Sequence, residues 1–354
     1  MSRHTKKIVK IILKKGYDKK EVENIKKDII RNKNADILAI YNPECIGIMN
    51  STKDLFKNNV GIGEIFSKKE AKEIARTIVE SNISQVMFSS IALGWISLIE
   101  YLKTMNKNIK IKFFWHGSHA MLVQRDETYF LYNILDMLDK GIASSIAFVK
   151  ESMAKYYKEK GYNSYFLPNT LKLNGISIDK NIDVREKGKV NIGIYSAGNR
   201  WEKNTFNQLS AASMIENSIV DILPVTPLIK QFCNMMNINI KDENLGYLKR
   251  EDLLLRMAQN DINLYVTFTE CSPVTPLESL ELGVPCLTGN NHHYFRGTNL
   301  EKYLVVEAED DINEIRNKID IALKNRDEII KLYREWKAKY DIEVEKYFED
   351  FCNS

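Results

Sequence analysis

The chain has 354 residues, of which 44% are hydrophobic and 28% are charged, as expected for a globular protein with room for two domains. Sixteen glycines and seven prolines are too few for a low-complexity or collagen-like chain, and the sequence has neither an internal repeat nor an apolar run of about 18 residues. The net charge of +4 combines a surplus of eight positive charges in residues 1–34 with −4 over the remaining 320 residues.

The N-terminal stretch is the most basic part of the chain. Its hydrophobic residues Val22, Ile25 and Ile29 recur at helical spacing and predict a helix. The positive charges of residues 1–34 suit an anionic surface, such as a membrane leaflet or a lipid-diphosphate acceptor, or are simply a solvated helix face. A nucleic-acid partner is not expected, because Tyr17 is the only aromatic residue in this stretch.

Strands and helices alternate through the first half of the chain. The predicted strands are residues 35–42, 84–90, 110–115, 141–149 and 164–170. The predicted helices are residues 68–80, 94–105 and about 151–160. Such alternation predicts a parallel, doubly wound sheet.

A polar stretch at 172–189 is the best linker candidate, and a second alternation follows it. Its predicted strands are residues 190–197, 218–225, 261–268 and 285–289. Its predicted helices are residues 204–216, 227–236 and 250–259, with another from 276 and a charged helical end. The sequence therefore predicts two Rossmann-like domains, 1–170 and 171–340.

The five cysteines are scattered and never in CxxC spacing, which argues against a disulfide framework and against a zinc site. The apolar run at 8–13 is short and broken by Lys10, so no signal peptide is expected. We expect a cytoplasmic protein, with the basic N-terminal end as its contact with the inner face of the membrane.

One motif, "TECSPVTPLESLELGVPCLT" at 269–288, concentrates the chemistry. Glu270 lies just beyond a predicted strand, at the end where parallel sheets meet ligands. Thr275, Pro276 and Glu278 predict a helix start, with Thr275 as N-cap, so Glu278 is either a capping-box residue or a ligand contact. A helix N-terminus favours a diphosphate, Glu278 could accept hydrogen bonds from a ribose diol, and Glu270 could approach the sugar.

An apolar strand, Glu270, seven residues and Glu278 together resemble the E-x7-E region of family-4 ("group 1") glycosyltransferases. This resemblance implies a GT-B fold, in which two Rossmann-like domains face each other across a cleft, and sugar transfer from a nucleotide-diphosphate sugar with retention. The family usually has glycine within an E-x-F-G motif, and the matching positions in this chain are Ser272 and Pro273. The resemblance then implies that Ser272, Val274 and Thr275 contact the donor.

The resemblance assigns further residues in "SAGNRWEKN", "LGYLKREDL" and "NPECIGIMN". Arg200 and Lys203 would clamp the diphosphate and stabilise the charge of the leaving group. The alternative is that both are ordinary charged residues of a loop. Tyr247 and Leu248 match the segment that reads the nucleobase. Gly47 matches the glycine-rich loop that faces the diphosphate.

The histidines form a last set of candidates. His116 in "FFWHGSHA" ends a predicted strand and matches the family's histidine beside the donor sugar, with His119 as the weaker candidate. His292 and His293 are expected to be loop residues near the donor. No third ligand accompanies them, so no metal site is predicted.

Two alternatives remain open beside glycosyl transfer. The "WHGS" at His116 resembles the "WHGT" of teichoic-acid glycerophosphotransferases, also GT-B proteins, in which this histidine is thought to act as a base; their aspartate with tandem serines is missing here. The lost glycines are also compatible with an inactive GT-B module that only binds sugar nucleotide.

The expectation is a hexosyltransferase of cell-surface polysaccharide biosynthesis. It would need no cofactor and no obligatory metal, because Arg200 and Lys203 supply the positive charge. Its acceptor would be a glycan, a lipid-linked molecule or a protein. The resemblance also implies that the final helix, about 341–354, packs back onto the first domain. The sequence does not identify the sugar, the nucleotide or the acceptor.

Overall fold

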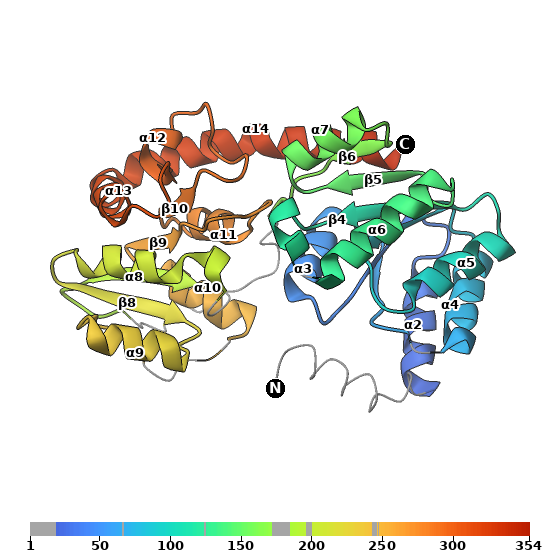
Figure 1. The fold of residues 1–354 in the computed structure, drawn as a ribbon, viewed down its shortest axis with the longest axis horizontal. Helices are drawn as coiled ribbons and strands as arrows, with labels where there is room; N and C mark the ends of the chain where they lie inside the picture. Colours follow the sequence, from blue (N-terminus) through green and yellow to red (C-terminus); the bar gives the residue numbers. More distant parts are fainter. Residues whose placement is uncertain are drawn as a thin grey trace. The chain divides into compact units, whose positions relative to one another are not determined.

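The computed structural model describes residues 19–65, 67–123, 125–171, 185–195, 200–242, 246 and 248–354. The chain divides into two α/β units (Figure 1). The first comprises Met1–Pro168 with Lys346–Ser354, and the second comprises Asn169–Glu345. Residues 1–18 of the basic stretch and residues 172–184 of the expected linker lie outside the described residues.

The first unit contains a six-stranded parallel sheet with strand order β2-β1-β3-β4-β5-β6. Its strands are β1 (Ile37–Tyr41), β2 (Asn59–Gly61), β3 (Gln85–Ser89), β4 (Lys110–Trp115), β5 (Ser145–Phe148) and β6 (Ser164–Phe166). Its helices are α2 (Lys19–Arg31), α3 (Ile46–Leu55), α4 (Lys68–Glu80), α5 (Trp95–Met105), α6 (Arg125–Asp139) and α7 (Glu151–Glu159), with a 3-10 turn η1 (His119–Val123).

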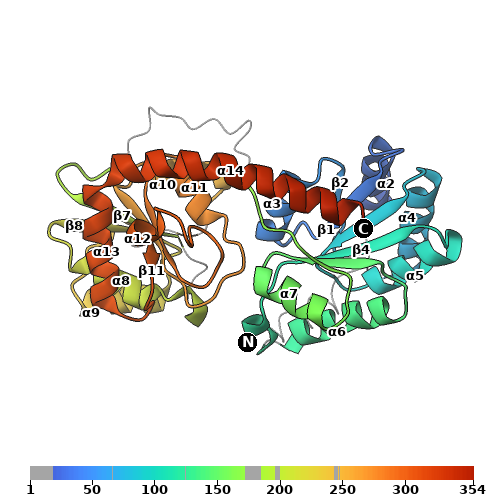
Figure 2. The same ribbon diagram turned by 90° about the horizontal axis from the view of Figure 1, so that it is seen from above.

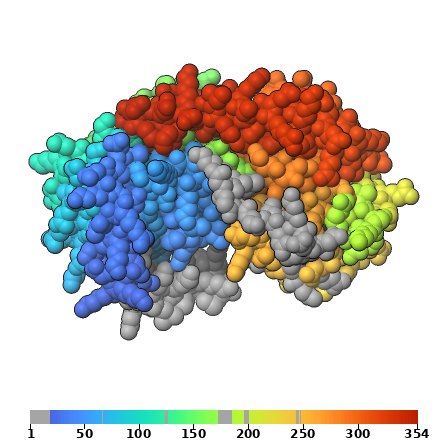
Figure 3. Space-filling view, turned by 180° about the vertical axis from the view of Figure 1, so that it is seen from behind, coloured from blue at the N-terminus to red at the C-terminus, as the bar shows by residue number. Residues whose placement is uncertain are grey.

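Alternation along the strands gives this sheet two buried faces. On one face, Phe88 and Phe113 belong to a hydrophobic core shared with α2, α4, α5, α6 and α7. Figure 1 shows α4 and α5 side by side over this face, and Figure 3 shows α2, in dark blue, on the surface of the unit. Helix α4 begins where predicted because the Ser67 side chain accepts a hydrogen bond from the Lys69 amide.

The other face of the first sheet is covered by α3 and by the end of the last helix, α14 (Arg326–Cys352). The Phe56 ring, just after α3, packs 6.4 Å from Phe114 of β4 and 5.0 Å from Phe348 of α14. Lys112 of β4 is fully buried on this face and donates to the carbonyl oxygens of Phe351 at 2.6 Å and Cys352 at 2.8 Å. The end of α14 is therefore part of the first unit.

The second unit contains a five-stranded parallel sheet with strand order β11-β10-β9-β7-β8. Its strands are β7 (Val190–Tyr195), β8 (Ser218–Leu223), β9 (Ile262–Tyr265), β10 (Cys286–Gly289) and β11 (Val305–Val306). Its helices are α8 (Thr205–Ser213), α9 (Pro227–Met235), α10 (Arg250–Ala258), α11 (Thr275–Glu281), α12 (Glu301–Leu304) and α13 (Ile312–Lys324), with a 3-10 turn η2 (Trp201–Lys203). Helix α13 lies against α8 (Figure 2).

The two doubly wound parallel sheets confirm the predicted fold class. One local prediction was wrong: Gly47 lies in the first turn of α3 rather than in a glycine-rich loop. The Cys45 amide donates to the Asn42 carbonyl, and this tight turn lets a helix begin directly after β1. In the described part of the chain, no helix combines the length and the apolar character needed to cross a bilayer.

Candidate functional site

The candidate site lies at the carboxyl edge of the second sheet, where β7 and β9 are adjacent parallel strands. On the carboxyl side of β7, Arg200 directly precedes η2, and the segment after β9 leads to Glu270. Because both segments leave the same edge of the sheet, their side chains meet. This edge therefore brings Arg200 and Lys203, from one predicted motif, close to Glu270, from another.

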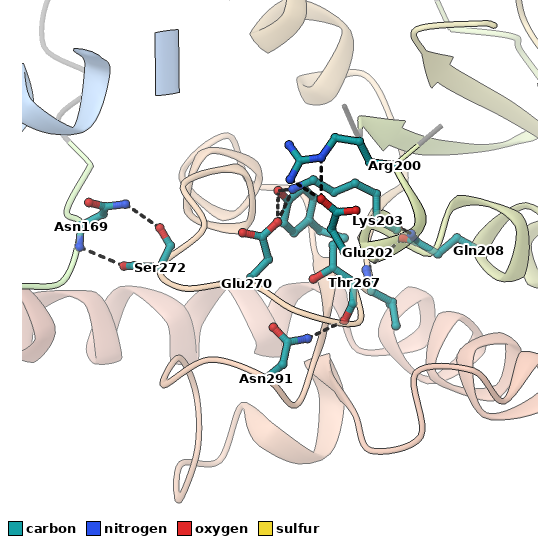
Figure 4. Close-up of polar contacts among 11 residues, drawn as sticks. Asn169, Arg200, Glu202, Lys203, Gln208, Thr267, Glu270, Ser272 and Asn291 are labelled. Carbon is teal, nitrogen blue, oxygen red and sulfur yellow. Dashed lines mark hydrogen bonds and ion pairs between the residues drawn. The ribbon is translucent and has the colours of Figure 1, made fainter. Parts of the chain in front are cut away.

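Lys203, Tyr265 and Glu270 form a closed triangle of polar contacts. The Lys203 ammonium forms an ion pair with Oε1 of Glu270 and donates to the Tyr265 hydroxyl at 2.9 Å. The Tyr265 hydroxyl in turn donates to Oε1 of Glu270 at 2.9 Å. Figure 4 shows the Lys203 side chain extended to the Glu270 carboxylate. The Lys203 side chain is 9% exposed and that of Glu270 is 17% exposed, so this pair is largely shielded from water.

The contacts within this triangle change the pKa of Lys203 and of Tyr265. Burial alone would lower the pKa of Lys203, but Tyr265 and Glu270 outweigh burial and raise it. Burial first, and then the Glu270 charge, raise the pKa of Tyr265. At neutral pH the site therefore holds an ammonium group and a neutral phenol beside the Glu270 carboxylate.

The second predicted cation, Arg200, is paired differently. Its guanidinium forms an ion pair with Glu202, and Nε donates to Oε1 of Glu202 at 2.6 Å (Figure 4). The Arg200 side chain is 38% exposed, whereas that of Glu202 is 10% exposed. The Glu202 carbonyl accepts a hydrogen bond from the Phe268 amide at 2.9 Å, which ties η2 to the segment after β9. Arg200 and Lys203 are thus held at one edge of the sheet, but by different carboxylates.

Gln208 of α8 fixes the backbone beneath the triangle. Its side-chain amide donates to the Lys203 carbonyl at 2.8 Å, and its side-chain oxygen accepts from the Val266 amide at 2.9 Å. Gln208 is fully buried, so these bonds are protected from water. Together with the bond between Glu202 and Phe268, they set the position of η2 relative to β9.

Glu278 is buried in α11 and accepts a hydrogen bond from Nε of Arg250, on α10, at 3.0 Å. The predicted N-cap at Thr275 is wrong. Val274 occupies the cap position with helical backbone angles, and Thr275 is the first helical residue. Pro276 is then the second helical residue, still within the first turn, where its missing N–H is not needed.

The other residues predicted to contact the nucleotide-sugar donor differ in burial and in hydrogen bonding. Ser272 is buried; its hydroxyl accepts from the Asn169 amide at 2.9 Å, and its carbonyl accepts from the Asn169 side chain at 2.6 Å (Figure 4). Val274 is half-buried, as is Thr275. Leu248 packs beside a small core cluster of the same unit, and Tyr247 lies outside the described residues.

His116 belongs to the first unit, at the carboxyl end of β4. Its Nε2 lies 2.8 Å from the Ser89 hydroxyl, and its ring centroid lies 4.1 Å from that of Phe114. Burial lowers the pKa of His116 to about 3, so the ring is neutral at physiological pH. Gly47 also belongs to this unit and is exposed on α3.

The other histidines in the described part of the chain make aromatic contacts. His119 packs on Tyr157, and its Nε2 lies 3.2 Å from the Tyr157 hydroxyl. His293 stacks on Tyr340, and His292 is buried with Nδ1 accepting from the Tyr294 amide at 3.3 Å. Within the described ranges, no group of three His, Cys, Asp or Glu residues is arranged to hold a metal ion.

Comparison with known proteins identifies the fold as GT-B. No family model and no curated protein matches the sequence. Among solved structures, a UDP-forming α,α-trehalose-phosphate synthase from Burkholderia vietnamiensis superposes with a TM-score of 0.62 and 10% identity, over 90% of this chain and 100% of that one. HepE of Anabaena, solved with UDP and glucose, superposes with a TM-score of 0.63 and 8% identity. The match covers 90% of this chain and 98% of HepE.

TarM of S. aureus, solved with fondaparinux, α-GlcNAc-glycerol and UDP, is a third neighbour, with a TM-score of 0.56 and 12% identity. The match covers 80% of this chain and 59% of TarM. At these identities the likeness extends to the fold alone.

Sequence reasoning missed three residues that hold the predicted ones in place: Tyr265, Glu202 and Arg250. Each binds a predicted residue through a side-chain hydrogen bond or ion pair, and none belongs to the E-x7-E motif. One signal was available: Tyr265 lies within the predicted strand 261–268, five residues before Glu270, and the strand β9 that the structure contains ends at it. A phenol at the carboxyl end of a buried strand is well placed to bind a polar group at that edge.

Proposed function

We propose that this protein is a retaining glycosyltransferase, which transfers a sugar from a nucleotide-diphosphate sugar to a glycan, a lipid-linked molecule or a protein. The observation that carries the proposal is the triangle of Lys203, Tyr265 and Glu270 at the carboxyl edge of the second sheet of a GT-B fold. It combines a cation suited to a diphosphate with a carboxylate suited to a developing positive charge.

Each group has a defined role in this proposal. Lys203 and Arg200 neutralise the diphosphate as it leaves, which is the role that a divalent ion plays in other transferases. Glu270 positions the donor sugar or stabilises positive charge at its anomeric carbon. Glu278, whose carboxylate is oriented by Arg250, accepts hydrogen bonds from the ribose. No obligatory metal is part of the mechanism, so activity should survive treatment with EDTA.

UDP is the nucleotide to test first, because two structural neighbours were solved with UDP and a third is described as UDP-forming. A panel of nucleotide diphosphates, scored by thermal shift, identifies the base. A ligand at 100 times its dissociation constant adds about 2.7 kcal/mol to the free energy of unfolding. Release of the nucleotide from the matching sugar donor then measures turnover.

His116 bears on the competing glycerophosphotransferase hypothesis. A general base works best when its pKa lies near the working pH, whereas burial lowers the pKa of His116 to about 3. A neutral, weakly basic imidazole is better suited to a hydrogen bond with a hydroxyl group. Together with the missing aspartate and tandem serines, this favours glycosyl transfer as the proposed activity.

The two glutamates of the motif provide the direct test. Glu270→Gln keeps the shape of the side chain and removes its charge, so kcat should fall by about 100-fold with little change in donor KM. Glu278→Gln should mainly raise donor KM, because the ribose contact is made in both ground and transition states. If both variants keep wild-type kcat and KM, the carboxylates are structural and the assignment fails.

The basic N-terminal end supports a secondary proposal, contact with an anionic membrane. Co-sedimentation with vesicles of anionic lipid should be strong at low salt and fall steeply as salt is added. The variant to compare has the lysines of residues 6–15 replaced by glutamine. Equal recovery of both proteins in the supernatant at low salt would show that the stretch is only a solvated face.

A further inference from the structure

A chain of hydrogen bonds in the first unit leads from the interior to His116. The Thr52 hydroxyl of α3 donates to the Ile48 carbonyl at 2.7 Å. The Thr52 and Ser89 hydroxyl oxygens lie 2.6 Å apart, and the Ser89 oxygen lies 2.8 Å from Nε2 of His116. Both Thr52 and Ser89 are fully buried, so water does not compete for their hydroxyl groups.

The number of protons determines the direction of every bond in this chain. A carbonyl oxygen only accepts, so the single hydroxyl proton of Thr52 points to Ile48. The short contact between the two hydroxyls must then contain the Ser89 proton. Ser89 has no second proton to offer, so the contact with His116 must contain the proton on Nε2.

We propose that Thr52 and Ser89 are positioning residues that hold His116 in its neutral Nε2–H form, so that Nδ1 accepts a hydrogen bond from a hydroxyl group of the donor sugar or of the acceptor. The tautomer follows from the geometry alone. The ligand part rests on the proposed function and specifies its chemistry: a neutral O–H donor, and not a phosphate, at this position. A phosphate oxygen would require N–H on the facing nitrogen, and this relay places the ring's only proton on the opposite side.

The protonation state of the ring agrees with this arrangement. Desolvation lowers the pKa of His116 to about 3, which disfavours the doubly protonated imidazolium that could bind an anion through Nδ1. The ring is also packed against Phe114, which restricts its orientation. The relay therefore fixes both which nitrogen carries the proton and which way it points.

Nuclear magnetic resonance on protein labelled with 15N-histidine tests the tautomer without any substrate. Protonated and bare ring nitrogens of a neutral histidine have well-separated 15N shifts, and comparison with His116→Gln assigns the signal among the five histidines. We expect the Nε2–H pattern for His116, unchanged down to about pH 5. The Nδ1–H pattern in the wild type would overturn the relay.

Thr52→Val is the sharpest variant, because it is nearly isosteric and does not touch His116. Valine cannot accept from Ser89, so the Ser89 proton can turn to Nε2 and the ring should shift toward the Nδ1–H form. Thr77→Val is the matched control: Thr77 is also a buried helical threonine whose hydroxyl donates one turn back, to the Glu73 carbonyl at 3.0 Å. An unchanged His116 pattern in Thr52→Val would contradict the proposal.

Kinetics test the ligand. Once a donor is turned over, Thr52→Val should lower kcat about tenfold, while Thr77→Val should leave it unchanged. If donor hydrolysis without acceptor falls as well, the hydroxyl belongs to the donor sugar; if only transfer falls, it belongs to the acceptor. A switched tautomer with unchanged rates would overturn the ligand part. Should no donor be turned over even by the wild type, the proposed function and the ligand part fail together, and the spectrum still decides the relay.

Discussion

At the scale of single residues, the second unit uses one tyrosine hydroxyl to organise two charged groups. The Tyr265 hydroxyl donates to Glu270 and accepts from Lys203, so this one oxygen is hydrogen-bonded to both charged groups. Without it, the ammonium and the carboxylate would still attract each other but would lose a shared, directional partner. Hydrogen bonds to charged groups contribute more than neutral ones, so this hydroxyl should matter for the precision of the site.

Tyr265→Phe tests this role, since it keeps the buried ring and removes the oxygen. We expect kcat to fall about tenfold, equivalent to about 1.4 kcal/mol, with donor KM little changed. Combined with Glu270→Gln, the loss should be less than additive, because Tyr265 acts through the carboxylate.

Tyr333→Phe provides the matched comparison for this variant. Tyr333 is also a buried tyrosine that donates to a glutamate, Glu281, at 2.9 Å, but in a different part of the unit. Its replacement should cost about 1–2 kcal/mol of unfolding free energy and leave kcat unchanged. Equal effects of the two variants on kcat would show that Tyr265 is merely structural.

Residue-level prediction from the sequence had a clear physical limit. Glu270 and Glu278 could be named from their positions after a predicted strand and at a predicted helix start, and Lys203 from the family resemblance of its loop. Tyr265 and Arg250 could not, because their roles depend on which strands become neighbours in the sheet. The cap at Thr275 was misplaced by one residue, since threonine has the side chain of a cap and Val274 does not.

At the scale of elements, strand β7 shows how a missing side chain makes room for a polar network. A Cβ atom at Gly193 would lie 2.1 Å from the Asn263 side-chain oxygen and 2.3 Å from the Asn260 side-chain nitrogen. These two side chains are hydrogen-bonded to each other, and Asn260 also donates to the Tyr195 hydroxyl at 2.7 Å. Glycine is therefore required here by close approach rather than by backbone angle.

Gly193→Ala should destabilise the protein by about 2 kcal/mol or more, because the asparagine network must move or break. Gly47→Ala, in helix α3, is the control substitution for Gly193→Ala. Gly47 is helical, and nothing lies within 4 Å of its added Cβ, so alanine should stabilise by up to about 1 kcal/mol. Urea unfolding measures both changes, and a neutral Gly193→Ala would show that the network adapts freely.

Element boundaries were predicted best where a local signal marks them. Helix α4 and strand β4 match their predicted ranges, 68–80 and 110–115, to the residue. Helix α3 was missed because Pro43 and Gly47 are loop signals and its only buried side chains, Ser51 and Thr52, are polar. A helix that buries polar side chains has no hydrophobic periodicity to reveal it.

At the scale of the whole molecule, the first unit is built from two separate stretches of chain. Residues 346–354 supply the carbonyl groups that accept from Lys112, whose pKa is lowered by burial to about 8. They also place Phe348 against Phe56. Removing them would leave a buried ammonium without these acceptors and uncover one face of the first sheet.

A chain ending at Glu345 should therefore lose several kcal/mol of stability in its first unit. Hydrogen exchange resolved by peptide should show faster exchange in β3 and β4, while β7 and β9 keep their protection. Uniform protection across both units in the truncated chain would contradict this account of α14.

The split origin of the first unit has a consequence for biosynthesis. A ribosome makes residues 1–168 first, yet the segment that closes one face of their sheet emerges only after the entire second unit has been translated. Until residue 346 emerges, the first unit lacks the acceptors of Lys112 and the cover of the aromatic residues around it, while the second unit can complete its fold. The order of folding should thus run opposite to the order of synthesis, and nascent chains stalled before residue 346 should bind chaperones through their N-terminal half.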